Sequence, residues 1–441
     1  MTRAGMTLVE TELDRYRART PESARLHAEA SAFVPGALSR GTLAYPPYPF
    51  YGTRGDGARL IDVDGNSYLD MINNYTSLIH GHCHQPTADA VAQVMTTGQA
   101  LGTPTATEAQ LAKVLVERIP AVEAVRFTTT GSEALQYAIR IARAATGRKR
   151  VLKFEGAFHG SETALVQDIW APPLPPGTAI PSRSASAGLD DVSTITAVFN
   201  DPAAVSAAFA RWGDEIAVVV VEPYLGNNAL ISAKPDFLDA VFTEARRRGA
   251  LVLLDEIQGL RAAYGGSQSV FGVQPDLVTM GKIISGGFAL AAYGGRRDLI
   301  ELMAAQNNAI PQSGTFTAVS AATAAGLAAL QHYQRADYDR LQALRNALAE
   351  AMIEEFSRKA IPVQVNGLGS MFHVSLNSRL VNSYARHYES DHELWSAIRL
   401  GLLNRGVNMM LRGTGCLSTP MDSTTVDEVA AALRDVLDQL P

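Results

Sequence analysis

Short apolar runs alternate with stretches of helical periodicity between about residues 70 and 310. The runs are AVRFTTT, RVLKFEG, IAVVVVEP, ALVLLDE and DLVTMGK. Strands this apolar are typical of a parallel sheet that is buried on both faces and connected by helices. We therefore expect an α/β fold whose large domain has a mostly parallel central sheet flanked by helices.

Two of the connecting helices have recognisable ends. In GSEALQYAIRIARAATGR, residues 131–148, apolar side chains recur on one face and Gly147 follows the last turn. In KPDFLDAVFTEARRRG, residues 234–249, Pro235 occupies the first turn and Gly249 follows the last one. Proline near the start and glycine after the end are typical helix boundaries. The pattern predicts a helix at each place.

The composition changes near residue 316, which suggests a second domain. An alanine-rich helical segment, AVSAATAAGLAAL, leads into a charged helical segment, and a βαβ-like unit follows. Near the other end of the chain, GARLIDVDGNSYLD predicts two short strands around a turn at Asp64-Gly65. We expect residues 1–69 and 316–441 to form a smaller α+β domain from both termini, and residues 70–315 to form the large domain.

The composition also excludes several classes of protein. The 441 residues carry a formal net charge of −6, whereas a nucleic-acid-binding domain needs a basic patch or stripe. No apolar run approaches the roughly 18 residues of a membrane span, and the N-terminus lacks the apolar core of a secretory signal. Two cysteines far apart in sequence do not suggest a disulfide framework. We expect a cytoplasmic protein that binds neither nucleic acid nor membrane.

The first candidate site is the strand–turn–helix stretch VRFTTTGSEALQYAIR. The unpaired N–H groups at the start of such a helix favour an anion. Thr130, Gly131 and Ser132 could therefore hold a phosphate through backbone and hydroxyl hydrogen bonds. The alternative is an ordinary helix N-cap with Glu133 in the first turn.

The second candidate is the pair Asp255 and Glu256, which follows the apolar run of GALVLLDEIQ. The pair is expected at the C-terminal end of a buried strand, where ligands of open α/β sheets bind. A carboxylate in such surroundings needs a cation or hydrogen-bond donors. The alternative is a structural carboxylate that caps a loop.

The third candidate is Lys282, one of six lysines, which lies between an apolar run and a glycine pair in LVTMGKIISGG. A P-loop does not fit, because Asp276 stands where its first glycine belongs and Ile283 where serine or threonine follows the lysine. A surface lysine is an alternative. A desolvated lysine beside glycines can instead be a Schiff-base amine.

The three candidates together match one cofactor. A helix start would anchor a phosphate, a strand-end carboxylate would pair with a pyridinium nitrogen, and a strand-end lysine would bond to an aldehyde. These groups are the three chemical handles of pyridoxal phosphate. The sequence therefore predicts a pyridoxal phosphate enzyme.

The chain resembles the class III, fold-type I aminotransferases, and most of all the branch with glutamate-1-semialdehyde aminomutase and the β-amino-acid transaminases. The resemblance rests on motifs found in the same order through nearly the whole chain: DVDGNSYLD, GHCH, TTTGSEA, FEGAFHG, VVVVEPYLGN, LLDEIQGLR, PDLVTMGKIISGG, GTFT and LSTPM. Each motif alone is weak evidence, whereas the ordered set is specific. The resemblance implies a transfer of an amino group between an amino acid, with β-amino acids among the candidates, and a keto acid.

The resemblance also implies residue roles around the cofactor. Lys282 matches the Schiff-base lysine that then moves the proton, and Asp255 matches the partner of the pyridine nitrogen. Phe158 and Ile257 match the residues on the two ring faces, and Glu222 lies near the ring in its motif. The remaining cofactor-binding positions that it implies are His159, Asn227 and the phosphate turn Thr130, Gly131 and Ser132.

Other implied roles concern the neighbouring subunit and the substrate. Thr315, in SGTFT, matches a threonine that reaches the phosphate of the neighbouring subunit, which implies a homodimer with shared active sites. Arg40 and Arg412 fall where the β-amino-acid transaminases place carboxylate-binding arginines, and a guanidinium suits a carboxylate. Tyr75 is expected to line the same pocket. The alternative for each arginine is a position on the surface or at an interface.

The chain departs from the family pattern at two places. DEIQGLRAAYGG is a short form of the loop after the Asp-Glu pair, as in the aminomutase and β-amino-acid branch. TAVS replaces the usual asparagine after GTF, which leaves the contacts of that segment open.

Other functions are alternatives to transamination. An aminomutase or racemase on the same scaffold would need a single substrate, and a regulatory relative would bind the cofactor without turnover. HGHCH, residues 80–84, suggests a metal site. The family has a related segment without a metal, so we expect none.

Overall fold

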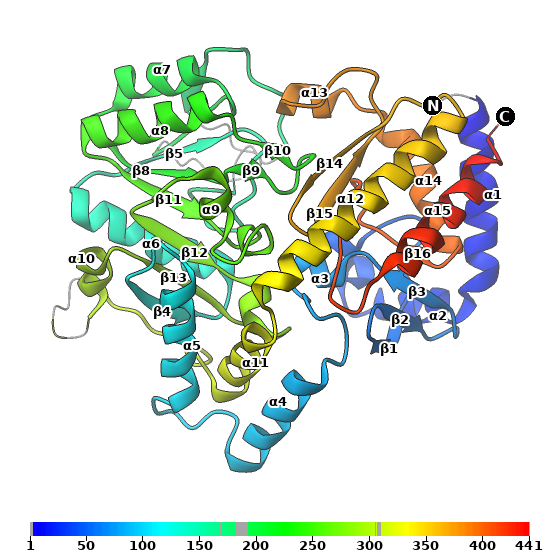
Figure 1. The fold of residues 1–441 in the computed structure, drawn as a ribbon, viewed down its shortest axis with the longest axis horizontal. Helices are drawn as coiled ribbons and strands as arrows, with labels where there is room; N and C mark the ends of the chain where they lie inside the picture. The colour runs from blue at the N-terminus through cyan, green and yellow to red at the C-terminus, as the bar shows by residue number, and fades with distance from the viewer. Residues whose placement is uncertain (1–2, 167–169, 182–192, 305, 307–309, 441) are drawn as a thin grey trace. The chain divides into compact units, whose positions relative to one another are not determined.

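The computed structural model describes residues 3–166, 170–181, 193–304, 306 and 310–440. The chain divides into two compact units (Figure 1). Unit 1 comprises Met1–His84, Arg340–Leu380 and Ser390–Pro441, and unit 2 comprises Gln85–Asp339 and Val381–Glu389. No helix in the described part of the chain is long and apolar enough to cross a membrane.

Unit 2 is built on an eight-stranded sheet. In spatial order the strands are β4 (Ala124–Thr128), β13 (Ala291–Gly295), β12 (Leu277–Met280), β11 (Leu251–Asp255), β8 (Ile216–Val221), β5 (Arg150–Phe154), β7 (Thr194–Ala197) and β6 (Ala179–Pro181). The five neighbouring strands from β12 to β7 are parallel. β13 is antiparallel to both of its neighbours, and β6 is antiparallel to β7. The five apolar runs thus all form strands, and the predicted mostly parallel sheet is confirmed.

The sheet is covered on both faces, as its apolar strands require. Along β8, Val219 and Val221 pack in one core with α7 (Pro202–Trp212) and α8 (Pro235–Arg248), whereas Val218 and Val220 pack in a second core with α6 (Gly131–Thr146). Figure 1 shows α7 and α8 side by side along one face of the sheet. The predicted helix ends are confirmed, because Gly147 and Gly249 adopt left-handed φ angles of 68° and 66° directly after α6 and α8.

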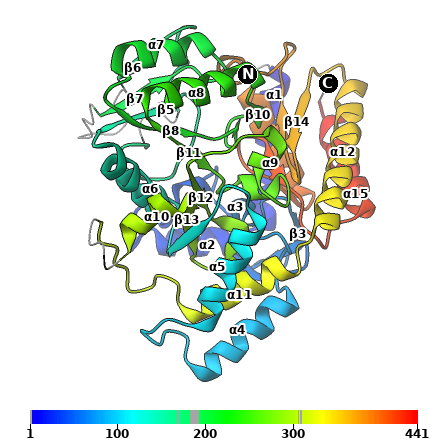
Figure 2. The same ribbon diagram turned by 60° about the vertical axis from the view of Figure 1, so that its left-hand side comes forward.

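An alanine-rich helix, α11 (Ser320–Gln331), supports the segment that carries Lys282. It packs against α4 (Gln85–Thr97), α5 (Ala106–Arg118) and the 3-10 turn η4 (Lys282–Ser285), and the three helices lie together in both views (Figure 1, Figure 2). Apart from its last residue, α11 is buried along its whole length. This burial places residues 316–339 in unit 2, whereas we expected the second domain to begin at residue 316.

The rest of unit 2 consists of short elements. They are β9 (Tyr224–Leu225), β10 (Ile231–Ser232), η3 (Gly259–Arg261), α9 (Ser267–Phe271), α10 (Arg297–Ile300), η5 (Glu301–Met303) and α13 (Tyr384–Tyr388). α13 belongs to unit 2 because Val381 and Tyr384 are part of its core, with Tyr384 packed against Gly156. This excursion of the C-terminal region into unit 2 was not expected from the sequence.

Unit 1 contains both ends of the chain. Its elements are α1 (Arg3–Arg19), α2 (Pro21–Ala30), η1 (Pro35–Ala37), η2 (Gly41–Leu43), β1 (Gly52–Asp56), β2 (Arg59–Asp62), β3 (Ser67–Asp70), α3 (Asn73–Thr76), most of α12 (Arg335–Arg358), β14 (Gln364–Leu368), β15 (Met371–Ser375), α14 (His392–Asn404), β16 (Val407–Asn408), β17 (Thr414–Cys416) and α15 (Ser423–Leu437). The turn predicted at Asp64-Gly65 joins the antiparallel strands β2 and β3.

The C-terminal segment of unit 1 is not a βαβ unit, so that expectation was wrong. β14, β15 and β17 form an antiparallel sheet, whereas β16 pairs in parallel with β3 in the sheet β1-β2-β3-β16. The strand after α14 therefore joins a sheet made by the N-terminal region. The sequence period of such short strands does not reveal which sheet each one joins. Residues 70–84, which we expected in the large domain, also belong to unit 1.

Replacing Gly326 with alanine should destabilise unit 2 at the contact between α11 and η4. A Cβ at Gly326 would lie 2.2 Å from the carbonyl oxygen of Ile284, so the helix would have to move away from the segment that begins at Lys282. Overpacking of this kind lowers the free energy of unfolding by about 1–3 kcal/mol. A lower midpoint of thermal unfolding for Gly326→Ala would show it. Gly52→Ala is the matched control, because its Cβ would come no closer than 4.0 Å to a neighbouring atom.

Candidate active site

A cavity of about 440 Å³ opens in unit 2 at the carboxyl edge of the parallel strands. Glu222 directly follows β8, Asp255 ends β11, and Lys282 lies two residues after β12. Because the strands are parallel, their C-terminal ends meet at one edge of the sheet. The lining residues are Gly131, Ser132, Phe158, Gly160, Ser161, Val166, Glu222, Asp255, Ile257, Gln258 and Lys282.

The N-terminus of α6 forms one wall of this cavity. The side chain of Thr130 accepts a hydrogen bond from the Glu133 N–H at 3.2 Å, so Thr130 is the N-cap and does not line the cavity. Gly131 and Ser132 line it, in the first turn, where backbone N–H groups have no partner within the helix. A Cβ on Gly131 would lie 2.5 Å from Ile257 Cδ1. Glycine therefore keeps this helix start in close contact with the opposite wall.

Ser132 also connects α6 to the loop that follows β5. The Ser132 Oγ accepts hydrogen bonds from the N–H of Ser161 at 2.9 Å and from its hydroxyl at 3.2 Å. Gly160 has a φ of 72°, and a Cβ there would lie 2.3 Å from the Ser132 Oγ. The helix start and the glycine loop thus make one concave surface of N–H and hydroxyl groups.

Asp255 is a buried carboxylate with hydrogen-bond donors on both oxygens. Its Oδ2 is 2.8 Å from Nδ1 of His159, and its Oδ1 accepts from the Ile257 N–H at 3.0 Å and the Thr279 hydroxyl at 3.4 Å. His159 is 1% exposed, and its Nε2 has no hydrogen-bond partner among the described residues. His159 therefore lies behind Asp255 and does not line the cavity.

Lys282 is half-buried and shares the cavity with Asp255 and Glu222. Its φ is 53°, a left-handed conformation that is unusual for a residue with a side chain. The surrounding backbone, from Gly281 to Gly286, forms the turn η4 against α11. Strain of this kind persists only where the surrounding structure holds it, and it is concentrated at functional sites.

Two further acids near the cavity differ from Asp255. Burial raises the pKa of Glu222 well above its usual range, and the charge of Asp255 raises it further, although the Phe158 N–H donates to Glu222 at 3.1 Å and Lys282 also lowers it. Burial raises the pKa of Glu256 to about 7. Glu256 accepts hydrogen bonds on both oxygens from Ser267 and Gln268, including their backbone N–H groups at 2.9 Å and 2.7 Å.

Besides Thr130 and His159, two more predicted cofactor positions do not line this cavity. Asn227 is half-buried and does not line it, whereas the next residue, Asn228, is buried and donates to the Gly156 carbonyl at 2.5 Å. Thr315 is exposed in the segment between η5 and α11. A sequence motif does not distinguish which of two adjacent asparagines points inward.

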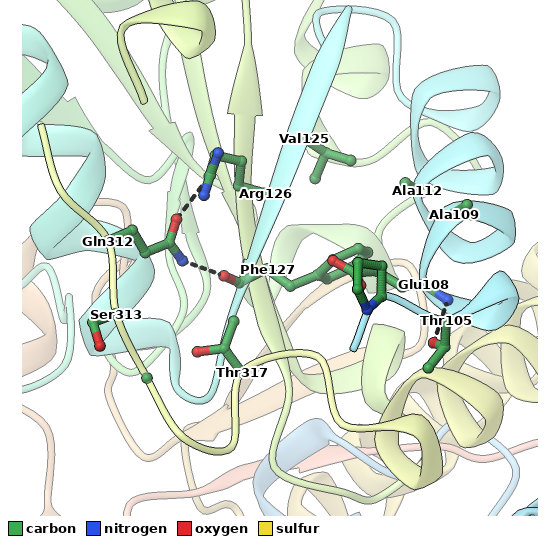
Figure 3. A pocket seen from close by; sticks show the side chains of 12 residues that line it. Thr105, Glu108, Ala109, Ala112, Val125, Arg126, Phe127, Gln312, Ser313 and Thr317 are labelled. Carbon is green, nitrogen blue, oxygen red and sulfur yellow. Dashed lines mark hydrogen bonds between the residues drawn. The ribbon is translucent and has the colours of Figure 1, made fainter. Parts of the chain in front are cut away.

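Residues around Thr315 line a second cavity in unit 2, of about 490 Å³ (Figure 3). It lies between α5, β4 and the segment from Gln312 to Thr317. Gln312 points toward β4, where its Oε1 accepts from the Arg126 Nε at 2.8 Å and its Nε2 donates to the Phe127 carbonyl at 2.6 Å (Figure 3). These bonds hold the start of the segment, while Thr315 and Phe316 remain exposed.

The three predicted substrate residues belong to unit 1, whereas the first cavity is built from unit 2. The Arg40 guanidinium donates to the Asn74 Oδ1 at 2.9 Å and lies 4.8 Å from the centre of the Tyr75 ring. The Tyr75 hydroxyl donates to the Thr42 carbonyl. Arg412 follows β16 in the loop that leads to β17. Arg40 and Tyr75 are thus in contact, although 34 residues separate Arg40 from Asn74.

The histidines of HGHCH have other partners in unit 1. His82 Nε2 is 2.8 Å from Asp70 Oδ2, and the rings of His80 and His84 stack with centroids 4.0 Å apart. Among the described residues, no group of three histidine, cysteine or acidic side chains is arranged to hold a metal ion.

Four cavity residues were missed in the sequence analysis: Gly160, Ser161, Val166 and Gln258. Gly160 and Ser161 directly follow Phe158 and His159, and Gln258 directly follows Ile257. Continuing each motif by one or two residues would have found these three. Nothing in the sequence around Val166 indicates its position.

Comparisons with known proteins identify the family. Residues 43–439 match the family described as Aminotransferase class-III. The chain belongs to the class-III aminotransferases. A curated relative, glutamate-1-semialdehyde 2,1-aminomutase 2 of Brevibacillus brevis, is 36% identical over 395 residues, 88% of this chain and 90% of the relative.

Solved structures of transaminases are similar over nearly the whole aminotransferase chain. An omega-transaminase from Sphaerobacter thermophilus has a TM-score of 0.92 and 36% identity, covering 95% of this chain and 97% of its own. A β-phenylalanine aminotransferase from Variovorax paradoxus has a TM-score of 0.89 and 31% identity, covering 98% and 97%. A structure described as a transaminase with PLP bound has a TM-score of 0.89 and 32% identity, covering 96% and 98%.

The cofactor of this aminotransferase is pyridoxal phosphate, and the unit 2 cavity fits it. The concave surface at the start of α6 has backbone N–H groups that suit a phosphate, and side chains at Gly131 or Gly160 would obstruct it. Asp255 presents a stabilised carboxylate, and Lys282 presents an amine to the same space. The protein is therefore a pyridoxal-phosphate-dependent enzyme of the transaminase class, as predicted from the sequence.

Replacing Glu222 with glutamine should stabilise the cofactor-free protein at neutral and alkaline pH. Because the pKa of Glu222 is raised in the folded protein, its protonation stabilises the fold. This contribution to the free energy of unfolding is complete only below the pKa that Glu222 has in the unfolded chain, and it is lost as the pH rises through the pKa of the folded protein. Glutamine cannot ionise, and each unit of pKa displacement that it removes is worth about 1.4 kcal/mol. We expect the unfolding midpoint of Glu222→Gln to exceed that of the wild type increasingly as the pH rises above about 5.

Glu256→Gln is the control for this measurement. Both Glu256 oxygens accept hydrogen bonds, so an amide nitrogen there would face a donor, and the variant should be less stable than the wild type. If the unfolding midpoint of Glu222→Gln does not exceed that of the wild type, or if the difference does not change with pH, the pKa of Glu222 is not raised in the folded protein.

Proposed function

We propose that this aminotransferase transfers an amino group between an amino acid with a carboxylate and a keto acid, with Lys282 as its catalytic amine. The observation that carries the proposal is the first of the two cavities described in unit 2, which brings together Lys282, Asp255 and the N-terminus of α6. These groups come from three parts of the chain, and each supplies one of the functions that pyridoxal phosphate requires. When bound, the cofactor supplies an aldehyde that captures an amine and a ring that accepts the electrons of a broken C–H bond.

The cavity walls would hold the cofactor in one orientation. The N–H groups of Gly131 and Ser132 would bind the phosphate at the start of α6, with Thr130 capping the same turn. Phe158 and Ile257 line the cavity and would cover the two faces of the ring. Asp255, supported by His159, would keep the pyridine nitrogen protonated.

Lys282 Nζ would take the proton from the substrate carbon and return it on the cofactor side. A neutral Glu222 beside it would leave Asp255 as the main negative charge of the cavity, because two neighbouring ionised carboxylates repel each other. Lys282 can then lose and gain its proton more readily, because no second ionised acid stabilises its protonated form. This division of the two acids resembles other sites in which adjacent carboxyl groups have different protonation states.

The proposed amino donor carries a carboxylate, and β-amino acids are our first candidates. Arg40 and Arg412 are the proposed carboxylate-binding residues, with Tyr75 beside Arg40. The similarity to the β-phenylalanine aminotransferase supports this class of donor. The similarity to the aminomutase from Brevibacillus brevis favours the second candidate, an internal transfer of the amine within one molecule.

We also propose a homodimer in the cytoplasm. Thr315 is exposed and lies outside the first cavity, which supports a role toward the phosphate of the neighbouring subunit. Phe316 beside it is 65% exposed, as expected of a side chain that a partner covers. Cys83 and Cys416 do not form a disulfide with each other, which suits a reducing compartment.

The half-reaction tests the proposed chemistry. The holoenzyme is mixed with a single amino donor and no keto acceptor, and absorbance and products are recorded. We expect pyridoxamine phosphate and keto product in an amount equal to the enzyme sites. Lys282→Ala should lower the rate by at least about 10³-fold, since both the covalent partner and the proton carrier are lost. Lys234→Ala, at an exposed lysine at the start of α8, is the control and should react normally.

The alternatives give different results in the same experiment. An unchanged cofactor spectrum together with a rearranged or racemised substrate would assign the protein to the isomerases. Full turnover by Lys282→Ala would rule out the proposed role of this lysine.

Mixed dimers test the proposed role of Thr315. Thr315→Asp should weaken binding of pyridoxal phosphate, because it places a carboxylate near the phosphate. If each site takes Lys282 from one subunit and Thr315 from the other, a heterodimer of Lys282→Ala and Thr315→Asp chains contains one intact site. We therefore expect heterodimers purified after co-expression of the two variants to have about half of the activity of a wild-type dimer. Absence of restoration in purified heterodimers would place Thr315 in its own subunit's site.

A further inference from the structure

Four consecutive residues of unit 1 form a left-handed turn. Asn73, Asn74, Tyr75 and Thr76, which make up α3, have φ angles of 49°, 47°, 55° and 71°. For residues with side chains, this conformation costs roughly 1–2 kcal/mol each. Only the surrounding structure can maintain such a turn, and strain of this kind is typical of functional sites.

Asn73 is the anchor of the turn. It is completely buried, and its Nδ2 donates to the carbonyl oxygens of Asp70 and Cys416, both at 2.9 Å. Asp70 Oδ1 in turn accepts from the Ile72 N–H at 3.0 Å. The anchoring contacts therefore come from Asn73 and its neighbours, and Asn74 is exposed.

Asn74 makes a different kind of contact. Its Oδ1 accepts from Arg40 at 2.9 Å, and its Nδ2 donates to the Ser77 hydroxyl at 3.0 Å, which fixes the direction of the amide. The Tyr75 ring lies against the same guanidinium, 4.8 Å from its central carbon. The strained turn thus holds Arg40 through two adjacent side chains.

Arg40 is held without being neutralised. No acidic side chain in the described part of the chain forms an ion pair with it, and Asn74 occupies one of its five N–H groups. A planar guanidinium fixed at one nitrogen and one face retains an edge for a carboxylate. An amide suits this task, because it orients the cation without contributing a competing charge.

We propose that Asn74 is a positioning residue that orients Arg40 toward the carboxylate of the amino donor, and that it thereby selects donors with a carboxylate. The inference rests on the substrate role of Arg40 proposed above. The left-handed turn is the structural cause, because it directs Asn74 and Tyr75 to the same guanidinium.

Two variants separate the amide from the turn. Asn74→Gly removes the amide but accepts a φ of 47° without strain. Asn74→Asp retains the shape and adds a carboxylate that pairs with Arg40. The first substrate pair is 3-amino-3-phenylpropanoate and 1-phenylethylamine, which differ only in that the amine has a hydrogen in place of the carboxylate group. If another donor reacts better in the half-reaction, that donor and its decarboxylated amine replace them.

We expect both variants to lose activity toward the acid selectively. KM for the acid should rise about three- to tenfold in Asn74→Gly and more in Asn74→Asp, because a hydrogen bond to a charged group is lost or a competing ion pair is formed. The acid-to-amine ratio of kcat/KM should fall by the same factors. Calorimetric titration of the holoenzyme with 3-phenylpropanoate, which lacks the amine, should show the same order of weakening.

Thermal unfolding distinguishes this role from a structural one. Asn74→Gly relieves backbone strain, so its unfolding midpoint should be equal to or higher than that of the wild type. Ala360→Gly is the matched control, because Ala360 is also exposed in unit 1 with a φ of 52°. It should relieve strain equally and leave KM for the acid unchanged.

Four outcomes would overturn the inference. The first is an equal loss with acid and amine, and the second is a lowered unfolding midpoint that accounts for the loss. The third is a selective loss of activity toward the acid in Arg40→Ala but not in the Asn74 variants, which would refute the role of Asn74 while that of Arg40 stands. The fourth is an Arg40→Ala variant without selectivity: the substrate role of Arg40 then fails and the inference fails with it, while the half-reaction remains an independent test of the chemistry.

Discussion

A buried carboxyl group that is fully hydrogen-bonded, at the carboxyl edge of a parallel sheet, is the feature on which the candidate active site depends. His159, Ile257 and Thr279 supply hydrogen bonds to the two oxygens of Asp255, as a buried carboxyl group requires. Burial raises the pKa of Glu222 at the same edge well above its usual range, and the charge of Asp255 raises it further. The cavity thus combines a hydrogen-bonded carboxyl group with the amine of Lys282, two of the groups that suit pyridoxal phosphate.

Close approach of backbones places the other groups around that charge. Gly131 lets the start of α6 approach Ile257, and Gly326 lets α11 approach the backbone after Lys282. At both positions a Cβ atom would clash with the neighbouring segment, so the packing around the cavity requires glycine there. Lys282 itself adopts a left-handed conformation within this packed surrounding.

Unit 1 also contains an uncommon backbone conformation, but without glycine. Its left-handed turn contains four residues with side chains, and a buried asparagine pays for the strain through two backbone hydrogen bonds. The exposed Asn74 and the half-buried Tyr75 of the turn then contact Arg40. In unit 1, a buried anchor thus maintains an uncommon backbone conformation next to a cation.

Local patterns determined much of this protein before any contact was known. Apolar runs became the strands, Gly147 and Gly249 ended the helices, and Asp255 and Lys282 came at strand ends, because periodicity and capping act over a few residues. Long-range contacts decided the rest. They inserted β13 antiparallel between β12 and β4, drew α11 into unit 2, and brought Val166 to the cavity. They also forced the left-handed turn at Asn73. Such features depend on groups that are distant in sequence, so only the tertiary structure could reveal them.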